Sequence, residues 1–383
     1  MPTPVLLIAT ATRWFGAARV PRSLANAGFE VTLLAPRGSL AEHSGFVSKV
    51  GHLPDNATPM QWVFAFAASV SAVRPRLVIA CDDTALRLLQ MLVLSPPEGM
   101  QAQLQLQLAT LIRDSLGDPT HYRTSVDKTL LPPAAEALGV PTPPYTIAGE
   151  LSEAEAFARK HGYPVVLKRN HSSAGSGVAI CTDPGQLANA FAELKRAATQ
   201  DFERSGTDRL LVQAYIAGPT KFYPAMAWKG TILVGYAGER VVASPEPMGP
   251  PTVNRYHHGP ELRALASKLA AGFGMTGFFS PEFVEDARTG RPYLLEINRC
   301  IVGGAHRGAA MNADHWAALH AALEGTPSTT RSDFDEGEEH ISVHFPQEWL
   351  RDPHSHWLRE YPVDVPWDEP KLIEALLAMR KER

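Results

Sequence analysis

The stretch that decides the fold is Tyr163–Val178, which reads YPVVLKRNHSSAGSGV. Val165–Leu167 is apolar, as is typical of a short buried strand, and Lys168 stands where that strand would end. The next segment, Ser172–Gly177, holds only small side chains, so its backbone N–H groups can approach an anion closely. The lysine adds a positive charge beside those donors, which favours a polyphosphate. The same residues also fit a β-hairpin with a flexible turn and a surface lysine, and no Gly-Lys-Ser/Thr sequence marks a P-loop.

Composition limits the class of protein. The chain has 383 residues, enough for two or three domains, and its net charge of −4 gives no support for a nucleic-acid partner. Cys81, Cys181 and Cys300 are isolated in the sequence, so neither a disulfide framework nor a structural zinc site is indicated. The longest apolar stretch, Trp62–Val73, is too short to cross a membrane, and no basic segment of a signal peptide precedes the first apolar run. We therefore expect a cytoplasmic protein without a membrane or nucleic-acid partner.

The first third of the chain predicts a doubly wound α/β domain. Apolar runs at Val5–Ala9, Phe29–Ala35 and Leu77–Ala80 alternate with helical patterns, as expected for parallel strands covered on both faces. No Gly-x-Gly-x-x-Gly follows the first run, so a dinucleotide site is not indicated. Asp82 and Asp83 follow the third run, where they can either contact a substrate or cap the next helix. We favour the capping role.

Two helix starts are predicted in the middle of the chain. A helix beginning at Asp127 is expected to be interrupted by the pair Pro132–Pro133. A second helix, 153–161, is expected to have Ser152 as its N-cap and Glu155 as the partner residue of a capping box.

A carboxylate pair marks a predicted hairpin near the end of the chain. Glu282 lies on an expected strand over 277–285, and Glu296 and Asn298 lie on the partner strand over 293–299. The two-residue period of a strand puts Glu296 and Asn298 on one face. Three oxygen ligands of this kind suit Mg²⁺. The alternative is a solvent-exposed polar face, but the apolar residues that alternate with Glu296 and Asn298 weaken it.

Taken in order, these elements resemble the ATP-grasp superfamily. The resemblance covers roughly residues 120 to 325 and rests on Lys128, Lys168 with Ser172–Gly177, Leu211–Gly218, Glu282 and Leu295–Arg299. It implies an α/β protein, with an α+β ATP-grasp part, in which an N-terminal doubly wound parallel sheet precedes a two-lobed ATP-grasp fold. The implied divisions are an N-terminal domain (1–117), a helical connector with the first lysine (118–147), a small lobe (148–216), a large lobe with the metal site (217–325) and a C-terminal extension (326–383).

The resemblance also implies roles for individual residues. The nucleotide would be bound by Lys128, Val166, Lys168, Ser173, Gly175, Ser176, Gly177, Gln213, Ala214, Ile216 and Leu295. One or two Mg²⁺ ions, for which Mn²⁺ can substitute, would be held by Glu282, Glu296 and Asn298. Lys168 and Arg299 would act on the transferred phosphoryl group. Ala214, Thr220 and Ser280 depart from the family pattern.

The substrate residues are predicted from two segments: the glycine-containing segment that follows the metal ligands, and a polar cluster before the helix that starts at Pro260. We expect Arg255, Gly303, His306 and Arg307 to contact a substrate, although Gly303 also fits a simple turn.

The activity that the resemblance implies is ATP-dependent ligation. A small carboxylic acid or amino acid would become an acyl phosphate with release of ADP, and an amine would then attack it. Two alternatives stay open: a carboxylase or carbamoyl-phosphate type of enzyme that uses bicarbonate, and an ATP-binding protein without catalysis. The resemblance further implies a homodimer.

Overall fold

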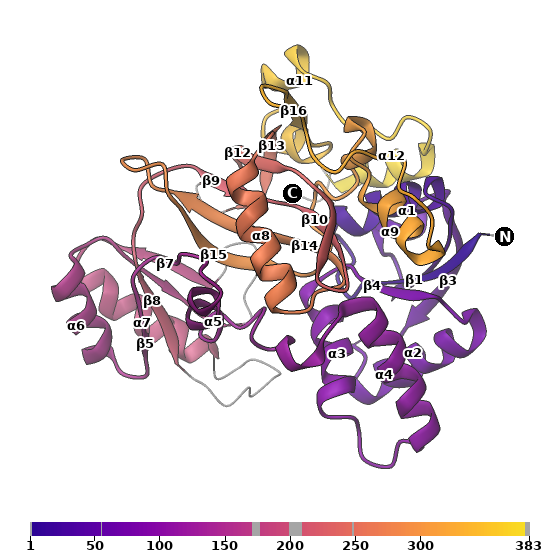
Figure 1. The fold of residues 1–383 in the computed structure, drawn as a ribbon, viewed down its shortest axis with the longest axis horizontal. Helices are drawn as coiled ribbons and strands as arrows, with labels where there is room; N and C mark the ends of the chain where they lie inside the picture. Colours follow the sequence, from indigo (N-terminus) through magenta and orange to yellow (C-terminus); the bar gives the residue numbers. More distant parts are fainter. Residues whose placement is uncertain (1, 55, 171–176, 199–208, 247–248, 380–383) are drawn as a thin grey trace.

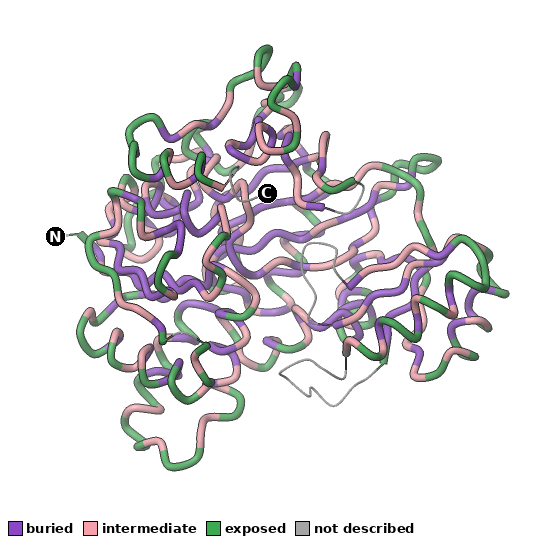
Figure 2. Tube along the Cα trace, turned by 180° about the vertical axis from the view of Figure 1, so that it is seen from behind, coloured by how far each residue is buried: buried purple, intermediate pink, exposed green. Residues whose placement is uncertain are grey.

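The computed structural model describes residues 2–54, 56–170, 177–198, 209–246 and 249–379. Their strands form three sheets (Figure 1). The N-terminal sheet and a second, larger sheet lie against each other, and the third sheet forms a small lobe at the far side of the larger one. Figure 2 shows that buried backbone runs through the strands of all three sheets, while exposed residues lie on the outer helices and loops.

The N-terminal sheet is parallel, with strand order β3-β2-β1-β4. Its strands are β1 (Thr3–Ile8), β2 (Phe29–Pro36), β3 (Val47–Leu53) and β4 (Leu77–Ala80). Three of the four were predicted from their apolar runs. The edge strand β3 has the sequence VSKVGHL and is half exposed, so it lacks the continuous apolar pattern that revealed the others.

Helices cover both faces of this sheet, as a doubly wound domain requires. They are α1 (Phe15–Asn26), α2 (Pro59–Val73), α3 (Asp83–Leu94) and α4 (Ala102–Leu116), together with the later α9 (His315–Glu324). Side chains of α2, α3 and α4 pack around Leu6 and Ile8, and those of α1 and α9 pack around Val5 and Leu7 on the opposite face. The alternation of residues along β1 therefore divides the core into two layers.

The predicted capping role is confirmed for Asp82 but not for Asp83, which is the first residue of α3. The Asp82 carboxylate accepts a hydrogen bond from the N–H of Ala85 (2.9 Å) in the first turn of α3. It also accepts from the N–H and hydroxyl of Thr10 and from the N–H of Ala11. Asp82 thus fixes the loop after β1 against the start of α3.

The small lobe contains the stretch from which the sequence analysis began. Its antiparallel sheet has the order β5-β8-β6-β7 and is formed by β5 (Tyr145–Ala148), β6 (Val165–Lys168), β7 (Val178–Cys181) and β8 (Leu210–Ala214). Helices α6 (Leu151–His161) and α7 (Pro184–Ala198) pack on it through a shared apolar core. Lys168 ends its strand, as predicted.

Two predicted helix starts are wrong. Helix α6 begins at Leu151, so its capping box is formed by Glu150 and Glu153 and not by Ser152 and Glu155. The pair Pro132–Pro133 does not interrupt a helix. It lies in the first turn of α5 (Leu131–Ala137). An N–H group in the first turn has no carbonyl partner within the helix, so a proline there costs no hydrogen bond.

The large sheet has eight strands. They are β9 (Thr220–Phe222), β10 (Ala225–Trp228), β11 (Thr231–Gly235), β12 (Ala237–Ala243), β13 (Pro251–His257), β14 (Gly277–Glu285), β15 (Pro292–Asn298) and β16 (Glu339–Val343). The order is β11-β10-β14-β9-β12-β13-β16, and β15 pairs with β14. Helix α8 (Pro260–Gly272) packs on one face with Phe279 and Phe283, while Phe222 and Phe278 on the other face join the core shared with the N-terminal sheet.

The segment after residue 326 completes the large sheet. Strand β16 pairs with β13, and the chain continues through α10 (Gln347–Arg351), α11 (Trp357–Glu360) and α12 (Pro370–Ala378). Leu372 and Leu376 of α12 pack against Ala18 of α1 and Leu40. The extension, for which the sequence offered no account, therefore joins the large lobe to the N-terminal domain. In the described part of the chain, no helix has both the length and the apolar character needed to span a bilayer.

Candidate functional site

The carboxylates predicted to hold a metal face each other across the β14–β15 hairpin. Glu282 lies opposite Glu296, and Ser280 lies opposite Asn298. One step further along, Phe283 pairs with Leu294, so Leu295 is an extra residue and forms a β-bulge. The carbonyl oxygen of Leu295 accepts a hydrogen bond from Lys168 Nζ (3.4 Å). The bulge thus connects the small-lobe lysine to the hairpin.

Each of the two carboxylates has a cationic partner. Lys128 Nζ lies 3.4 Å from Glu296 Oε2, and Arg240 Nη2 lies 3.2 Å from Glu282 Oε2. Asn298 Nδ2 donates to Glu282 Oε1 at 2.8 Å. The sequence analysis missed Arg240, because an arginine on β12 carries no signal until the sheet places that strand near β14.

The surroundings of these groups shift their pKa values in different directions. Burial, followed by the charge of Glu296, raises the pKa of Glu282. Burial also opposes ionisation of Glu296, but Lys128 and Lys168 outweigh it and lower the pKa of Glu296. Burial lowers the pKa of Lys168 to about 8. The hairpin therefore places two facing carboxylates in a region of low polarity, where a bound cation would offset their repulsion.

The chemistry of these donors fits Mg²⁺. Two carboxylates and one amide are hard oxygen donors of the kind that Mg²⁺ takes while it keeps several waters. Among the described residues there is no group of three or more His, Cys, Asp or Glu side chains that would form a fuller protein cage. A cation at Glu282, Glu296 and Asn298 would consequently need further ligands from water or from a bound phosphate.

Lys128 is held in place from the small lobe. Its backbone N–H donates to Asn170 Oδ1 (2.8 Å), and Asn170 Nδ2 donates to Thr129 Oγ1 (3.4 Å). Asn170 lies within the stretch that opened the sequence analysis and was not singled out there. Through it, β6 and the connector present their two lysines to the same hairpin.

Gln213 is the clearest sign of a ligand in the small lobe. It lies on β8 between Tyr145 and Val166 and is only 2% exposed, yet neither polar atom of its side chain has a hydrogen-bond partner among the described residues. Native structures rarely leave such atoms unpaired, so a bound molecule is an obvious partner. The N–H of the next residue, Ala214, donates to the carbonyl of Pro144. Because a proline has no N–H, Pro144 cannot donate to the carbonyl of Ala214 in return.

The remaining predicted nucleotide residues are placed only in part. Ser173, Gly175 and Ser176 lie outside the described residues. Gly177 is described, and its carbonyl accepts from the N–H of Arg169 (2.8 Å). Ile216 follows β8 directly after Ala214 and Tyr215, on the segment that leaves the sheet.

Arg299 has contacts other than those predicted. Its guanidinium is buried and donates to the carbonyl of Leu116 at the end of α4, to Ser125 Oγ (3.4 Å) and to the carbonyl of Thr276 (3.5 Å). Burial lowers the pKa of Arg299 to about 10. These contacts favour a role in joining the hairpin to the N-terminal domain over the predicted catalytic one.

The four predicted substrate residues lie on two elements: Arg255 on β13, and Gly303, His306 and Arg307 on the segment after β15. Arg255 is 39% exposed at its side chain and faces Glu339 (3.8 Å), because alternation along β13 turns its neighbour Asn254 to the buried face. His306 Nε2 lies 2.9 Å from Asp364 Oδ2 in the C-terminal extension. Burial lowers the pKa of His306 to about 4. Gly303 and Arg307 belong to the same irregular segment as His306.

A buried polar chain leads from the extension to the large sheet. Asp364 Oδ2 also lies 3.4 Å from His344 Nδ1, and His344 Nε2 lies 2.9 Å from Asn254 Nδ2. Asn254 in turn lies opposite Arg240 in the backbone register of the antiparallel strands β12 and β13. Sequence reasoning missed Asn254 and Asp364, since residues so far apart along the chain give no common pattern.

The chain is similar in sequence to an ATP-binding domain and to ligases. The family model described as "Carbamoyl-phosphate synthase L chain, ATP binding domain" matches residues 127–223, which include Lys128, Lys168 and Gln213. The arginine-specific carbamoyl phosphate synthase large chain of Cutaneotrichosporon cutaneum is 25% identical over 181 residues, which are 45% of this chain and 15% of that protein. D-alanine–D-alanine ligase B of Chromobacterium violaceum is 27% identical over 165 residues, which are 42% of this chain and 52% of that protein. The chain thus spans less than two thirds of either relative.

A solved structure extends the likeness beyond the matched segment. The biotin carboxylase domain of the 2-oxoglutarate carboxylase of Hydrogenobacter thermophilus, crystallised with MgADP and bicarbonate, superposes with a TM-score of 0.67. The superposition covers 89% of this chain and 74% of that one, at 18% identity. This protein has the ATP-grasp fold. In this fold, Lys128 and Lys168 meet the β14–β15 hairpin between the small and large lobes.

Proposed function

We propose that this protein is an ATP- and Mg²⁺-dependent ligase that converts a carboxylate into an acyl phosphate and joins it to an amine. The observation that carries the proposal is the pair Glu282 and Glu296, which face each other across a hairpin with Lys128 and Lys168 beside them. This arrangement offers anionic ligands for a metal and cationic partners for phosphates at one place. The likeness to D-alanine–D-alanine ligase supports formation of a C–N bond.

The nucleotide would lie between the two lobes. The unpaired side chain of Gln213 and the carbonyl of Ala214, which faces Pro144, are suited to the polar edge of adenine. Val166 and the bulged Leu295 would contact the faces of the ring. Lys128 and Lys168 would then bind phosphate oxygens, and both are already directed to the hairpin by their contacts with Glu296 and Leu295.

Glu282, Glu296 and Asn298 would hold the metal. When bound, Mg²⁺ offsets the negative charge of the phosphates and orients them. The residues of the chain supply the rest: Arg240 balances Glu282, and Lys128 balances Glu296, so the site can gain a cation and a polyphosphate without leaving a buried charge unpaired.

The reaction needs positioning more than covalent chemistry from the protein. A carboxylate oxygen of the substrate attacks the γ-phosphorus and ADP leaves. The amine then attacks the acyl carbon, inorganic phosphate leaves, and the amine loses a proton. Lys168 would neutralise charge that develops on the transferred phosphoryl group. Exclusion of water protects the acyl phosphate between the two steps.

A bicarbonate-dependent reaction is the second candidate. The likeness to a biotin carboxylase domain crystallised with bicarbonate favours it, and the same phosphate and metal residues would serve it. The third candidate, ATP binding without catalysis, has less support because binding alone does not require the full set of Glu282, Glu296 and Asn298. A homodimer stays a prediction.

The test is product analysis with the purified full-length protein, Mg²⁺ and ATP. Carboxylic acids and amino acids are supplied singly and in pairs, and hydroxylamine is added to parallel samples as a trap for acyl phosphates. ADP, phosphate and a new amide with one particular pair would support the ligase. ADP with bicarbonate alone would favour the second candidate. AMP with pyrophosphate would contradict the acyl-phosphate route.

A further inference from the structure

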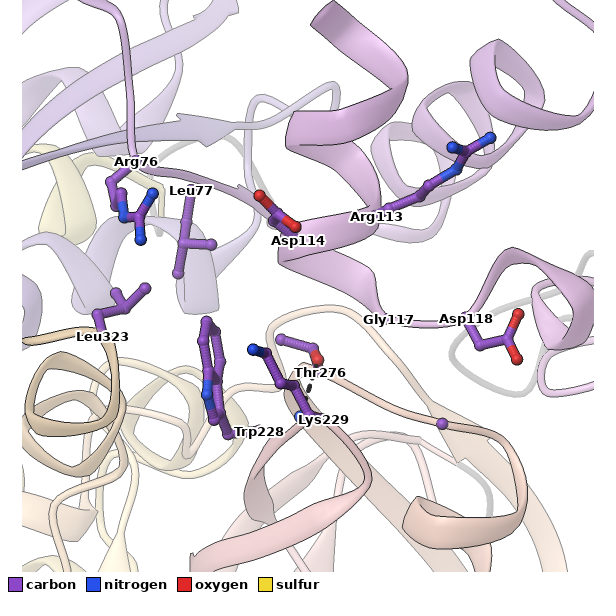
Figure 3. Close-up of a pocket in the computed structure, with 11 residues that line it drawn as sticks. Arg76, Leu77, Arg113, Asp114, Gly117, Asp118, Trp228, Lys229, Thr276 and Leu323 are labelled. Carbon is purple, nitrogen blue, oxygen red and sulfur yellow. Dashed lines mark hydrogen bonds between the residues drawn. The ribbon is translucent and has the colours of Figure 1, made fainter. Parts of the chain in front are cut away.

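A second polar cluster surrounds a cavity that the proposed reaction does not use. The cavity has a volume of about 420 Å³ and lies at the start of β4, where Arg76 and Leu77 line it (Figure 3). The hairpin site lies beyond the other end of that strand, where the charges of Glu296 and Lys128 act on Asp83. Its walls come from both the N-terminal domain and the large lobe, and they include Arg76, Leu77, Asp114, Trp228, Lys229 and Leu323. The volume falls within the range of about 300 to 1,000 Å³ that is usual for small-molecule sites.

Charges of both signs reach this cavity without partners. Arg76, Asp114 and Lys229 are exposed, and within the described part of the chain none of the three has an ion-pair partner. Figure 3 shows their charged groups directed toward the space between the two domains, and Arg113 and Asp118 also line the cavity. Lys229 Nζ lies 5.5 Å from the centre of the Trp228 ring. Cations and carboxylates are thus both available to a ligand.

The backbone holds Lys229 in a conformation that lysine seldom adopts. Its φ is 49°, and Gly230 follows with a φ of 80°, in the tight turn between β10 and β11. A turn of this kind usually has Asn or Gly at the first position, and a left-handed lysine costs on the order of 1 kcal/mol or more. A hydrogen bond from the N–H of Lys229 to Thr276 Oγ1 (3.1 Å) supports it. The turn thus places Lys229 in the wall of the cavity.

The rest of the wall is apolar. Leu77 is buried, and Trp228 and Leu323 are half-buried, so their side chains offer apolar surface beside the charged groups. A ligand that satisfies all of these groups carries a carboxylate for Arg76 and Lys229, an ammonium for Asp114 and an apolar side chain for Trp228 and Leu323. A polyphosphate fits less well, because Asp114 would repel it.

We infer that this cavity binds a free α-amino acid with a large apolar or aromatic side chain, at a site separate from the hairpin site. The ligand would contact both domains. They already meet here through a bridge between Gly117 and Met275 and a hydrogen bond from the N–H of Asp118 to the carbonyl of Gly274 (3.0 Å). Occupancy therefore adds contacts across a domain junction and raises the melting temperature of the protein.

The test is calorimetric titration of the full-length protein, without nucleotide or metal, with leucine, phenylalanine and tryptophan. Saturable binding of at least one of them is expected. The affinity should fall by about tenfold or more in Arg76→Gln and in Asp114→Asn, since each removes a charged hydrogen bond. Arg288→Gln is the matched control, because that exposed arginine is not among the residues that line the cavity, and it should change the affinity by less than about twofold.

Modified ligands identify the contacts. N-acetylphenylalanine, which lacks the ammonium group, should bind more weakly than phenylalanine to the unaltered protein but not to Asp114→Asn. Both exposed-residue variants should melt at the temperature of the unaltered protein. The inference is overturned if no amino acid binds at millimolar concentration. It is also overturned if binding persists in Arg76→Gln and Asp114→Asn but is lost in Glu296→Gln, which would place the amino acid at the hairpin.

Discussion

Strand β4 has a polar cluster beyond each of its ends, and the two clusters differ in whether their charged side chains have ion-pair partners. At the hairpin site each carboxylate contacts a cation: Glu296 contacts Lys128, and Glu282 contacts Arg240. At the cavity beside the start of β4, here called the rear cavity, Arg76, Asp114 and Lys229 are exposed and have no ion-pair partner within the described residues. One cluster is half-buried and balanced, whereas the other is open and unbalanced.

The difference follows from the cost of taking charge out of water. A buried ion without a partner is unfavourable by several kcal/mol, so the hairpin site must balance its charges before any ligand binds. Exposed charges at the rear cavity remain hydrated and need no protein partner. The hairpin is therefore preorganised for chemistry, and the rear cavity is suited to reversible binding. Removing a charge from the hairpin site should therefore lower the turnover rate, whereas removing one from the rear cavity should lower only the affinity for its ligand.

The largest effect is expected at the hairpin. Glu296→Gln removes one of two facing carboxylates and leaves Lys128 without its counter-charge, so ADP formation should fall by about 10²- to 10³-fold. The control is Glu285→Gln, which alters a carboxylate on β14 that pairs with Lys221 (2.6 Å) at the other end of the hairpin. Steady-state ADP release by both variants is the measurement. Unchanged turnover in Glu296→Gln would refute the assignment of the metal site.

Arg299 connects the two clusters and should affect folding more than chemistry. Arg299→Met removes the guanidinium that donates to the buried carbonyls of Leu116 and Thr276, and it leaves Leu116 with only the N–H of Thr276 as a donor (3.3 Å). Both residues adjoin or line the rear cavity. A loss of about 2 to 3 kcal/mol in the free energy of unfolding is expected, measured by denaturant titration. Arg288→Met, at an 87% exposed side chain, should cost far less. If turnover of the folded variant instead collapses while stability is kept, Arg299 acts on the phosphoryl group as the sequence suggested.

A smaller effect is expected from pH. Burial lowers the pKa of Lys168 to about 8, below its unfolded value of roughly 10.4. Between these values the unfolded chain binds more protons, so the stability of the free protein should rise with pH. Phosphates bind the charged lysine, so nucleotide affinity should fall by up to about tenfold per pH unit above about 8. Calorimetric titration with MgATP at several pH values tests this. Lys168→Arg stays charged, and an equal decline in that variant would exclude Lys168 as the source.

The sequence predicted what depends on local pattern. The buried strands, the position of Lys168 at a strand end and the pairing of Glu282 with Glu296 all follow from alternation and apolar runs. It did not predict contacts made by residues from separate strands, such as Arg240 with Glu282 or Asp364 with His306. Those contacts depend on sheet order, to which the C-terminal β16 contributes, and sheet order is set by packing of the whole chain. The rear cavity was hidden for the same reason.

The smallest effect is expected at Arg255, which lies on the outward face of β13, whereas its neighbour Asn254 lies on the buried face. The sequence favoured Arg255 as a substrate contact, but the structure turns it outward toward Glu339 and turns Asn254 inward. The exposed pair contributes about 0 to 1 kcal/mol, so Arg255→Gln should change stability by less than about 0.5 kcal/mol and turnover by less than about twofold. Asn254→Leu, its buried neighbour, leaves His344 Nε2 and the Tyr256 hydroxyl without a shared donor and should be clearly less stable. Thermal melting and ADP release of the two variants give the comparison. A large loss of turnover in Arg255→Gln at full stability would show that the outward face of β13 meets the substrate after all.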